Sequence, residues 1–229
     1  MSSRRLLVVS VLLGVPIIAW LSWRELSSQR QLLEVHVPII DKQPAVFASR
    51  TFDPAAPPAD MPPLAAGENA ECDSDFQAGA SVGGETRQID ATHSTVTITQ
   101  IKMTLHLNIT IWLPAGVTQH VAEHEEGHRE ISEFYYQTAD KRAERIAATY
   151  MGKQIEIAGT DLNAESIKAL QQMAADFTDE YNRELNTEPT QLLYDTITDH
   201  SRNEVVAKDA VAHAIKNITF ESTQPVSPQ

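Results

Sequence analysis

The sequence predicts an α+β domain, in which a small and mostly antiparallel sheet packs on a long helix and on further helices. Three observations carry this expectation. An alternating pattern of apolar and polar residues fills 101–113, an amphipathic helical pattern follows at once, and two more helical patterns lie downstream. A long apolar run near the start of the 229-residue chain predicts a transmembrane helix in front of the domain.

The strand is the clearest of these elements. Its odd positions are all apolar: Ile101, Met103, Leu105, Leu107, Ile109, Ile111 and Leu113. This unbroken period of two predicts one apolar face. Val96 and Ile98 are out of phase with the row, so a bulge or break is expected near Thr99. Upstream, Gly83-Gly84 predicts a turn between two strand-like stretches, 76–82 and 85–91.

The next segment has the pattern of an amphipathic helix that runs from about Thr118 to Met151. Pro114-Ala115-Gly116 ends the strand before it. At about 100° per residue, one stripe of this helix collects apolar residues while glutamates face the other way. The apolar members of the stripe are Val117, Val121, Ile131, Tyr135, Ala139 and Ile146. This stripe is expected to be buried.

Two histidines lie on the same stripe. They belong to the run His124-Glu125-Glu126-Gly127-His128, which matches the H-E-x-x-H pattern. Four residues apart on a helix, the two imidazoles can hold one metal ion, and Glu125 is placed to take a proton from a metal-bound water. The alternative is a pair of core histidines, each satisfied by a local hydrogen bond. The adjoining glutamate favours the metal site.

A catalytic zinc ion usually has three protein ligands, so a third ligand is needed. His200 is the favoured candidate, because it is expected in a loop or short helical turn, where a ligand is free of helix constraints. His213 and several glutamates remain alternatives. Helices are expected on either side of this loop, at 164–185 and 202–216.

Charge and cysteine content narrow the class of protein. The formal net charge is −13, and no basic patch stands out, which argues against a nucleic-acid role. Cys72 is the single cysteine of the sequence, so no intramolecular disulfide is possible. It is expected to be a small, half-buried apolar residue. A zinc-thiolate role is the weaker alternative.

Residues 1–24 are expected to form an uncleaved signal anchor. Arg4-Arg5 precede an apolar run over 6–23, and Trp20 and Trp23 suit the membrane–water interface. The arginine pair favours a cytoplasmic N-terminus, which would place the remainder of the chain outside the cytoplasm. Secretion after cleavage of a signal peptide is the alternative.

Residues 25–67 are expected to be a stalk and a Pro/Ala-rich linker. Five prolines stand among alanines between positions 53 and 67, a composition that suits a semi-rigid spacer rather than a core. The folded domain is therefore expected over 68–218. A disordered tail is expected at 219–229.

Two motifs together resemble a bacterial family of predicted secreted zinc-dependent proteases, which is defined as a domain of unknown function. The first is Ile111-Trp112-Leu113-Pro114 followed by His-Glu-x-Gly-His, and the second is Tyr-Asp-x-x-Thr-x-His at 194–200. The resemblance covers roughly Cys72 to Ile215. The first motif is generic to zincins, and the pairing of the two makes the match specific.

The resemblance implies a zincin-like fold with one Zn²⁺ per chain, held by His124, His128 and His200, and with Glu125 as the general base. The implied activity is hydrolysis of a peptide or protein substrate in the cell envelope, by a membrane-anchored domain in the periplasm. A catalytically silent zincin-like scaffold protein is the alternative, and a zinc hydrolase acting on cell-envelope amides is a third. The strand at 101–113 either offers its edge to an extended peptide or lies in the centre of the sheet.

Two more positions match the family's second motif. Tyr194 could stabilise an oxyanion if its hydroxyl reaches the metal, or it could be a core residue. Asp195 could orient a ligand histidine by a hydrogen bond, or only cap the following turn. The chain departs from the family at Ser201, where the family commonly has glycine.

Overall fold

The structure, a computed structural model, describes residues 37–64 and 67–221, with side chains up to residue 218. The chain divides into two compact units, Met1–Val37 and Pro38–Gln229, and the helices and strands described all lie in the second. The predicted signal anchor at 1–24 lies outside the described residues. Among those that are described, no helix is both long and apolar enough to cross a membrane.

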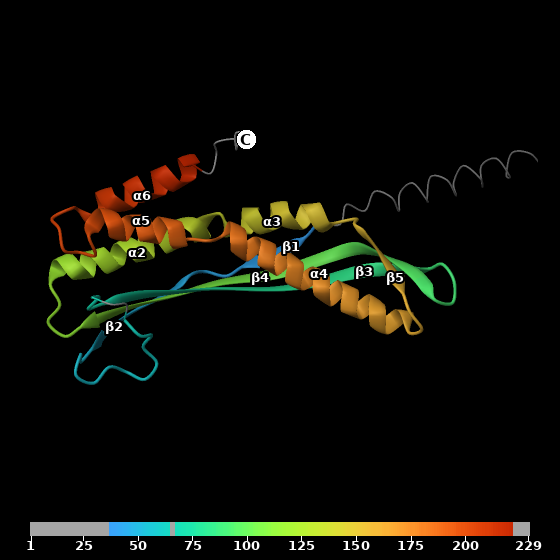
Figure 1. Ribbon diagram of the computed structural model, residues 1–229, viewed down its shortest axis with the longest axis horizontal. Coiled ribbons are helices and arrows are strands. Elements are labelled where there is room, and N and C mark those ends of the chain that lie inside the picture. The colour runs from blue at the N-terminus through green and yellow to red at the C-terminus, as the bar shows by residue number, and fades with distance from the viewer. Residues whose placement is uncertain (1–36, 65–66, 222–229) are drawn as a thin grey trace, which may run out of the picture. The chain divides into compact units, whose positions relative to one another are not determined.

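A single long strand organises the sheet (Figure 1). This strand, β4 (His93–Pro114), pairs antiparallel with β3 (Glu71–Gln88) over the whole length of β3. Near its start β4 also pairs antiparallel with β5 (Gln154–Ala158). Further along the same side of β4 as β5, it pairs with β1 (Ile39–Lys42) and β2 (Val46–Phe52), both of them parallel to it.

The α+β class is confirmed, but the expected small and mostly antiparallel sheet is wrong. The sheet is mixed, because two of the four partners of β4 run parallel to it. Both parallel strands come from the segment that was expected to be a stalk, so the domain begins near Pro38 rather than at Glu68. Pairing between segments some 60 residues apart depends on tertiary packing, which local sequence patterns do not report.

The predicted alternation in β4 is confirmed. The side chains of its odd positions from Ile101 to Ile111 are at most 2% exposed, while Lys102, His106 and Asn108 face solvent. The predicted bulge is confirmed as well: Gly83 pairs with Gln100 and Gly84 with Ile98, which leaves Thr99 as the extra residue.

The predicted turn at Gly83-Gly84 is wrong, because β3 continues through both glycines. Gly84 is needed there for a different reason. A Cβ atom at Gly84 would lie 2.7 Å from the main-chain oxygen of Thr97, so glycine allows the two strands to approach closely at the bulge.

The long helix expected from Thr118 to Met151 is two helices, α2 (Gln119–Gln137) and α3 (Ala139–Tyr150). Lys42 of β1 explains the break. Its Nζ atom donates to the carbonyl oxygens of Tyr136 (3.2 Å) and Gln137 (2.8 Å) and pairs with Asp140 (3.1 Å). A cation at the C-terminus of α2 satisfies carbonyls that a continuous helix would have used itself.

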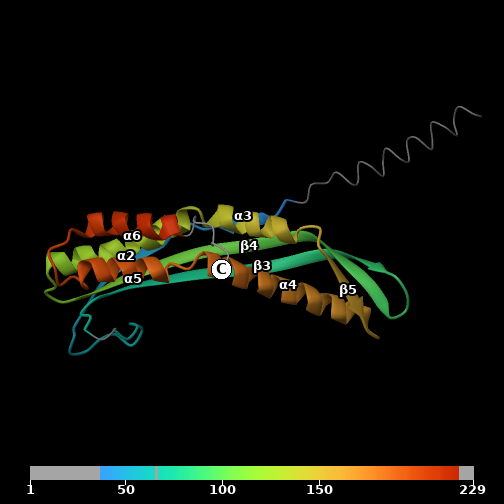
Figure 2. The ribbon, with the colours of Figure 1, turned by 45° about the horizontal axis from the view of Figure 1, so that its top comes forward.

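Three further helices complete the domain: α4 (Leu162–Glu184), α5 (Glu188–Thr198) and α6 (Ala207–Glu221). The first matches the expected helix at 164–185, and the third begins later than expected. The second occupies the segment expected as a loop or short turn. The helices lie on one face of the sheet (Figure 2), and α6 packs on α2 and α5.

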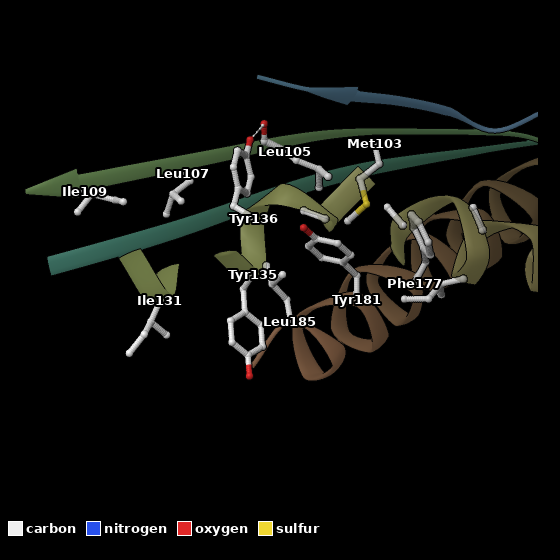
Figure 3. Close-up of a cluster of buried hydrophobic side chains, with 14 of the residues drawn as sticks. Met103, Leu105, Leu107, Ile109, Ile131, Tyr135, Tyr136, Phe177, Tyr181 and Leu185 are labelled. Atoms are coloured by element: carbon white, nitrogen blue, oxygen red, sulfur yellow. Dashed lines mark hydrogen bonds between the residues drawn. The ribbon is translucent and has the colours of Figure 1, made fainter. Parts of the chain in front are cut away.

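The core lies between the odd row of β4 and these helices. Figure 3 shows Leu105 and Met103 of β4 near Tyr136 of α2 and Tyr181 of α4, while the ring of Tyr135 points away from the strand. The hydroxyl of Tyr136 donates to the main-chain oxygen of Leu105 (2.9 Å). This packing fixes α2 over the sheet and thereby fixes the position of the histidines near its N-terminus.

Candidate metal centre

The first turns of α2 carry the H-E-x-x-H run. Thr118 caps the helix, its hydroxyl accepting a hydrogen bond from the main-chain nitrogen of Val121 (3.3 Å). His124 and Glu125 are each 3% exposed, and His128 is largely buried. The prediction that both histidines lie on the buried stripe of this helix is therefore confirmed.

Helix α5 brings a carboxylate to the two histidines. Oδ1 of Asp195 lies 2.9 Å from Nε2 of His128 and 3.4 Å from Nε2 of His124. The two Nε2 atoms are themselves 3.2 Å apart. These three residues form a cluster that could hold a metal ion, with Asp195 in the place where His200 was expected.

The spacing of the three donor atoms suits a metal ion. Zinc binds imidazole nitrogens and carboxylate oxygens at roughly 2.0–2.2 Å, so donors that share one tetrahedral ion lie about 3.3–3.6 Å apart. One of the three separations, 3.4 Å, lies in this range, and another, 3.2 Å, lies just below it. The third is shorter, as in a direct hydrogen bond between Asp195 and His128.

Gln191 fixes the orientation of His128. The amide nitrogen of Gln191 donates to the main-chain oxygen of His128 (3.2 Å) and to Oγ of Ser132 (3.1 Å). Its Oε1 atom therefore faces Nδ1 of His128, at 2.6 Å. With Nδ1 donating to this oxygen, Nε2 is the nitrogen that offers a lone pair to the cluster.

The sequence interpretation missed Gln191. A signal was available, because Gln191 and Asp195 are four residues apart and share one face of α5. The segment was expected as a loop, so that spacing was not applied to it. Nδ1 of His124, by contrast, is buried and has no hydrogen-bond partner among the described residues.

Tyr194 lies beneath the histidines rather than at the metal. Its ring stacks on His124, with ring centroids 5.0 Å apart, and meets the ring of His128 edge-on at 4.9 Å. Its hydroxyl donates to the main-chain oxygen of His124 (3.0 Å). The geometry thus agrees with the core alternative for Tyr194, and the expected oxyanion role has no support in it.

Tyr194 also explains the glycine of the His-Glu-x-Gly-His run. A Cβ atom at Gly127 would lie 2.1 Å from the hydroxyl oxygen of Tyr194 and 2.5 Å from the ring carbon that bears it. Glycine at this position lets α5 approach α2 closely enough to place Asp195 beside the two histidines.

His200 lies at the rim of the cluster. Its Nδ1 atom is 2.5 Å from Oε1 of Glu68 and 4.0 Å from Oδ1 of Asp195. The expected ligand set of His124, His128 and His200 is therefore not the set that the structure brings together. The other candidate, His213, is exposed on α6.

The backbone at His200 is unusual. Asp199, His200 and Ser201 have φ angles of 46°, 52° and 61°, which are left-handed and uncommon for residues other than glycine. Ser201 is the position at which the sequence departs from the family pattern. The left-handed φ gives a physical reason to expect glycine there.

The hollow around this cluster, called here the metal hollow, is strongly acidic. It has a volume of about 160 Å³, and its charged lining includes four carboxylates, those of Glu68, Glu71, Glu125 and Asp195. Burial opposes ionisation of Asp195, but its hydrogen bonds with His124 and His128 hold its pKa well below the usual range.

Glu125 titrates in a different environment. Burial raises its pKa to about 7; the charge of His128 lowers the pKa and that of Glu71 raises it further. Burial raises the pKa of Cys72 to about 12. Cys72 is half-buried and packs against the core, as expected, and it is not a member of the cluster.

A scan against protein-family models matched none of them, and searches of curated proteins and of solved structures found no match either.

Proposed function

We propose that this protein is a zinc-dependent peptidase of zincin type. One observation carries the proposal: Nε2 of His124, Nε2 of His128 and Oδ1 of Asp195 converge at the spacing of metal ligands, directly beside Glu125. A purely structural zinc site has no need of a buried glutamate there.

Bound zinc would polarise a scissile carbonyl and lower the pKa of a water molecule. The protein's own groups supply the remaining chemistry. By accepting a hydrogen bond from Nδ1, Gln191 would hold a metal-bound His128 in the tautomer whose lone pair is on Nε2. The carboxylate of Glu125, whose pKa of about 7 lies near neutral pH, would accept the proton of the attacking water and deliver it to the leaving amine.

The sheet offers a place for an extended substrate. Because β4 has partners on both sides, the strand at 101–113 is central. In the part of the chain described, β3 pairs with β4 alone and so has an unpaired edge. Glu71 and Cys72 at the start of β3 line the metal hollow. A peptide that pairs with this edge would pass the cluster with its backbone extended.

The location of the protein is part of the proposal. The apolar run at 6–23 behind Arg4-Arg5 supports a single-pass anchor in the inner membrane of a bacterium, with the domain in the periplasm. The net charge of −13 suits a domain that stays away from anionic headgroups.

The test compares the full-length chain with its Glu125→Gln variant, after incubation with zinc, on a mixture of quenched fluorescent peptides. We expect the variant to keep its zinc and to lose at least about 100-fold in kcat/KM. Glu133→Gln, on the same helix and away from the cluster, is the matched control and should keep full activity. Absence of turnover by a zinc-loaded parent would sink the peptidase proposal and favour the scaffold alternative.

A further inference from the structure

A second hollow, larger than the metal hollow, lies at the same end of the sheet. Its volume is about 560 Å³, within the range of about 300–1,000 Å³ that is usual for pockets that bind organic molecules. It is enclosed by the proline-rich loop after β2 and by the turn that connects β4 to α2. We call it the apolar hollow; Phe52, Met61, Leu64, Val117 and Val121 are among its lining residues.

The lining of the apolar hollow has no charged side chain. Its polar side chains are those of Asn69 and Thr118, and the others are proline, alanine, glycine or larger apolar residues. The contrast with the metal hollow is sharp, since four carboxylates line that one. In a chain of net charge −13, an uncharged hollow of this size selects for an uncharged, apolar occupant.

The loop that encloses the hollow is held in one conformation by its prolines, by a hydrogen bond and by an ion pair. Five prolines of the loop line it, and proline fixes the backbone φ angle. Asp53 caps the start of the loop by accepting from the main-chain nitrogen of Ala55 (2.9 Å). Arg50 of β2 pairs with Asp60 at 2.6 Å. A wall that is already ordered loses little entropy when a ligand binds.

Two segments lead directly from the apolar hollow to the metal hollow. On α2, Val121 lines the first and His124, three residues later and about one turn along the helix, lines the second. On the other wall, Asn69 lines the apolar hollow while its neighbours Glu68 and Ala70 line the metal hollow. The two hollows are therefore neighbours along both walls. Figures 1 and 2 both show the proline-rich loop at the end of the sheet where α2 starts.

We propose that the apolar hollow is a specificity subsite, which takes a large uncharged side chain, such as that of phenylalanine or leucine, from the peptide bound at the metal centre. The assignment rests on the proposed function. It goes further by naming a substrate class: peptides with a bulky apolar residue close to the bond that is cleaved.

The test follows binding by a signal that does not depend on turnover. The zinc-loaded, full-length Glu125→Gln chain, held in lipid nanodiscs, is labelled with ¹³C at its methionine methyl groups. Met61 lines the apolar hollow, whereas Met103 is buried under the helices and Met151 and Met173 pack around the core. The probes are five blocked pentapeptides, acetyl-Gly-Gly-X-Gly-Gly-amide, in which X is Phe, Leu, Ala, Asp or Lys.

We expect the Phe and Leu peptides to bind at least tenfold more tightly than the other three and to shift the Met61 methyl signal alone. Met61→Asp, which puts a charge into the hollow, should abolish the preference, as followed by titration calorimetry. Val117→Trp, which fills the hollow with bulk, should do the same. Ile89→Asp is the matched control, because Ile89 is 60% exposed and lies in the turn between β3 and β4.

Equal binding of all five peptides, or an unmoved Met61 signal with the Phe peptide bound, would overturn the subsite. The same peptides given to the parent chain separate this failure from failure of the proposed function. Cleavage without any preference for Phe or Leu would remove the subsite and keep the peptidase. A Phe peptide held at Met61 that the zinc-loaded parent never cleaves would remove the peptidase.

Discussion

The two halves of α2 bury different kinds of side chain: the C-terminal half buries mainly apolar residues, and the N-terminal half buries polar and charged ones. In the C-terminal half, Ile131, Tyr135 and Tyr136 belong to the apolar core, and both tyrosine hydroxyls have hydrogen-bond partners. In the N-terminal half, His124 and Glu125 are buried just as deeply. There the stripe faces Asp195 and the metal hollow instead of the apolar core.

The difference shows what each half does. The apolar half gains stability from burial and holds the helix in place. The polar half buries groups that are costly to remove from water without compensation. Four carboxylates line the metal hollow around it, and no lysine or arginine of the described residues does. A bound cation would compensate this half, so the two halves should respond differently to substitution and to zinc.

The largest effect is expected in the apolar half. Leu105→Ala removes a side chain that is 0% exposed beneath α2, and it should lower the free energy of unfolding by about 2–5 kcal/mol. Urea denaturation measures the loss. Lys102→Ala, on the solvent face of the same strand, should change it by less than about 0.5 kcal/mol. The zinc content of the folded Leu105→Ala protein should not change, and a parallel loss of zinc would contradict the separation of the two halves.

The second largest effect should be a loss of both stability and metal affinity. Gly127→Ala forces a Cβ atom against Tyr194, which should cost about 1–3 kcal/mol and push Asp195 away from the histidines. Thermal unfolding with and without zinc measures both consequences. Gly79→Ala is the control, since a Cβ atom at Gly79 meets nothing within 4 Å. Unchanged zinc affinity in Gly127→Ala would show that close contact with Tyr194 does not position the cluster.

A smaller effect should come from the junction between the two helices. Lys42→Met keeps most of the side chain's length but removes the donor to the carbonyls of Tyr136 and Gln137. We expect a loss of about 1 kcal/mol, and Lys102→Met serves as the control. Faster amide hydrogen exchange near residue 138 would locate the loss. Unchanged exchange there would contradict the capping role of Lys42.

The smallest effect should be a gain in stability. Ser201→Gly relieves a left-handed backbone position and should raise the free energy of unfolding by up to about 1 kcal/mol. Ser49→Gly, within the extended strand β2, should lower it. A destabilised Ser201→Gly protein would mean that the serine side chain compensates for the backbone conformation.

The features that the sequence predicted correctly are local ones. The period of two in β4, the bulge at Thr99 and the buried pair His124 and His128 all follow from spacing within a single element. The features it missed depend on segments far apart in the chain. Lys42 divides the long helix from a distance of 94 residues, and the parallel pairing of β1 and β2 has no local signature.

The third member of the cluster was missed for a related reason. Asp195 and His200 both stand in the second motif, and only the fold decides which one faces His124 and His128. Because α5 is a helix, Asp195 lies on the same face as Gln191 and points at α2. His200 follows the end of that helix, in left-handed backbone that directs it to Glu68.

The most direct test of this account is the zinc content of the full-length chain and four variants, measured by elemental mass spectrometry after incubation with zinc. We predict about one zinc ion per chain in the parent, in His200→Ala and in the exposed control His213→Ala, and little or none in His128→Ala and Asp195→Ala. Zinc that survives Asp195→Ala unchanged but is lost from His200→Ala would contradict the centre formed by His124, His128 and Asp195.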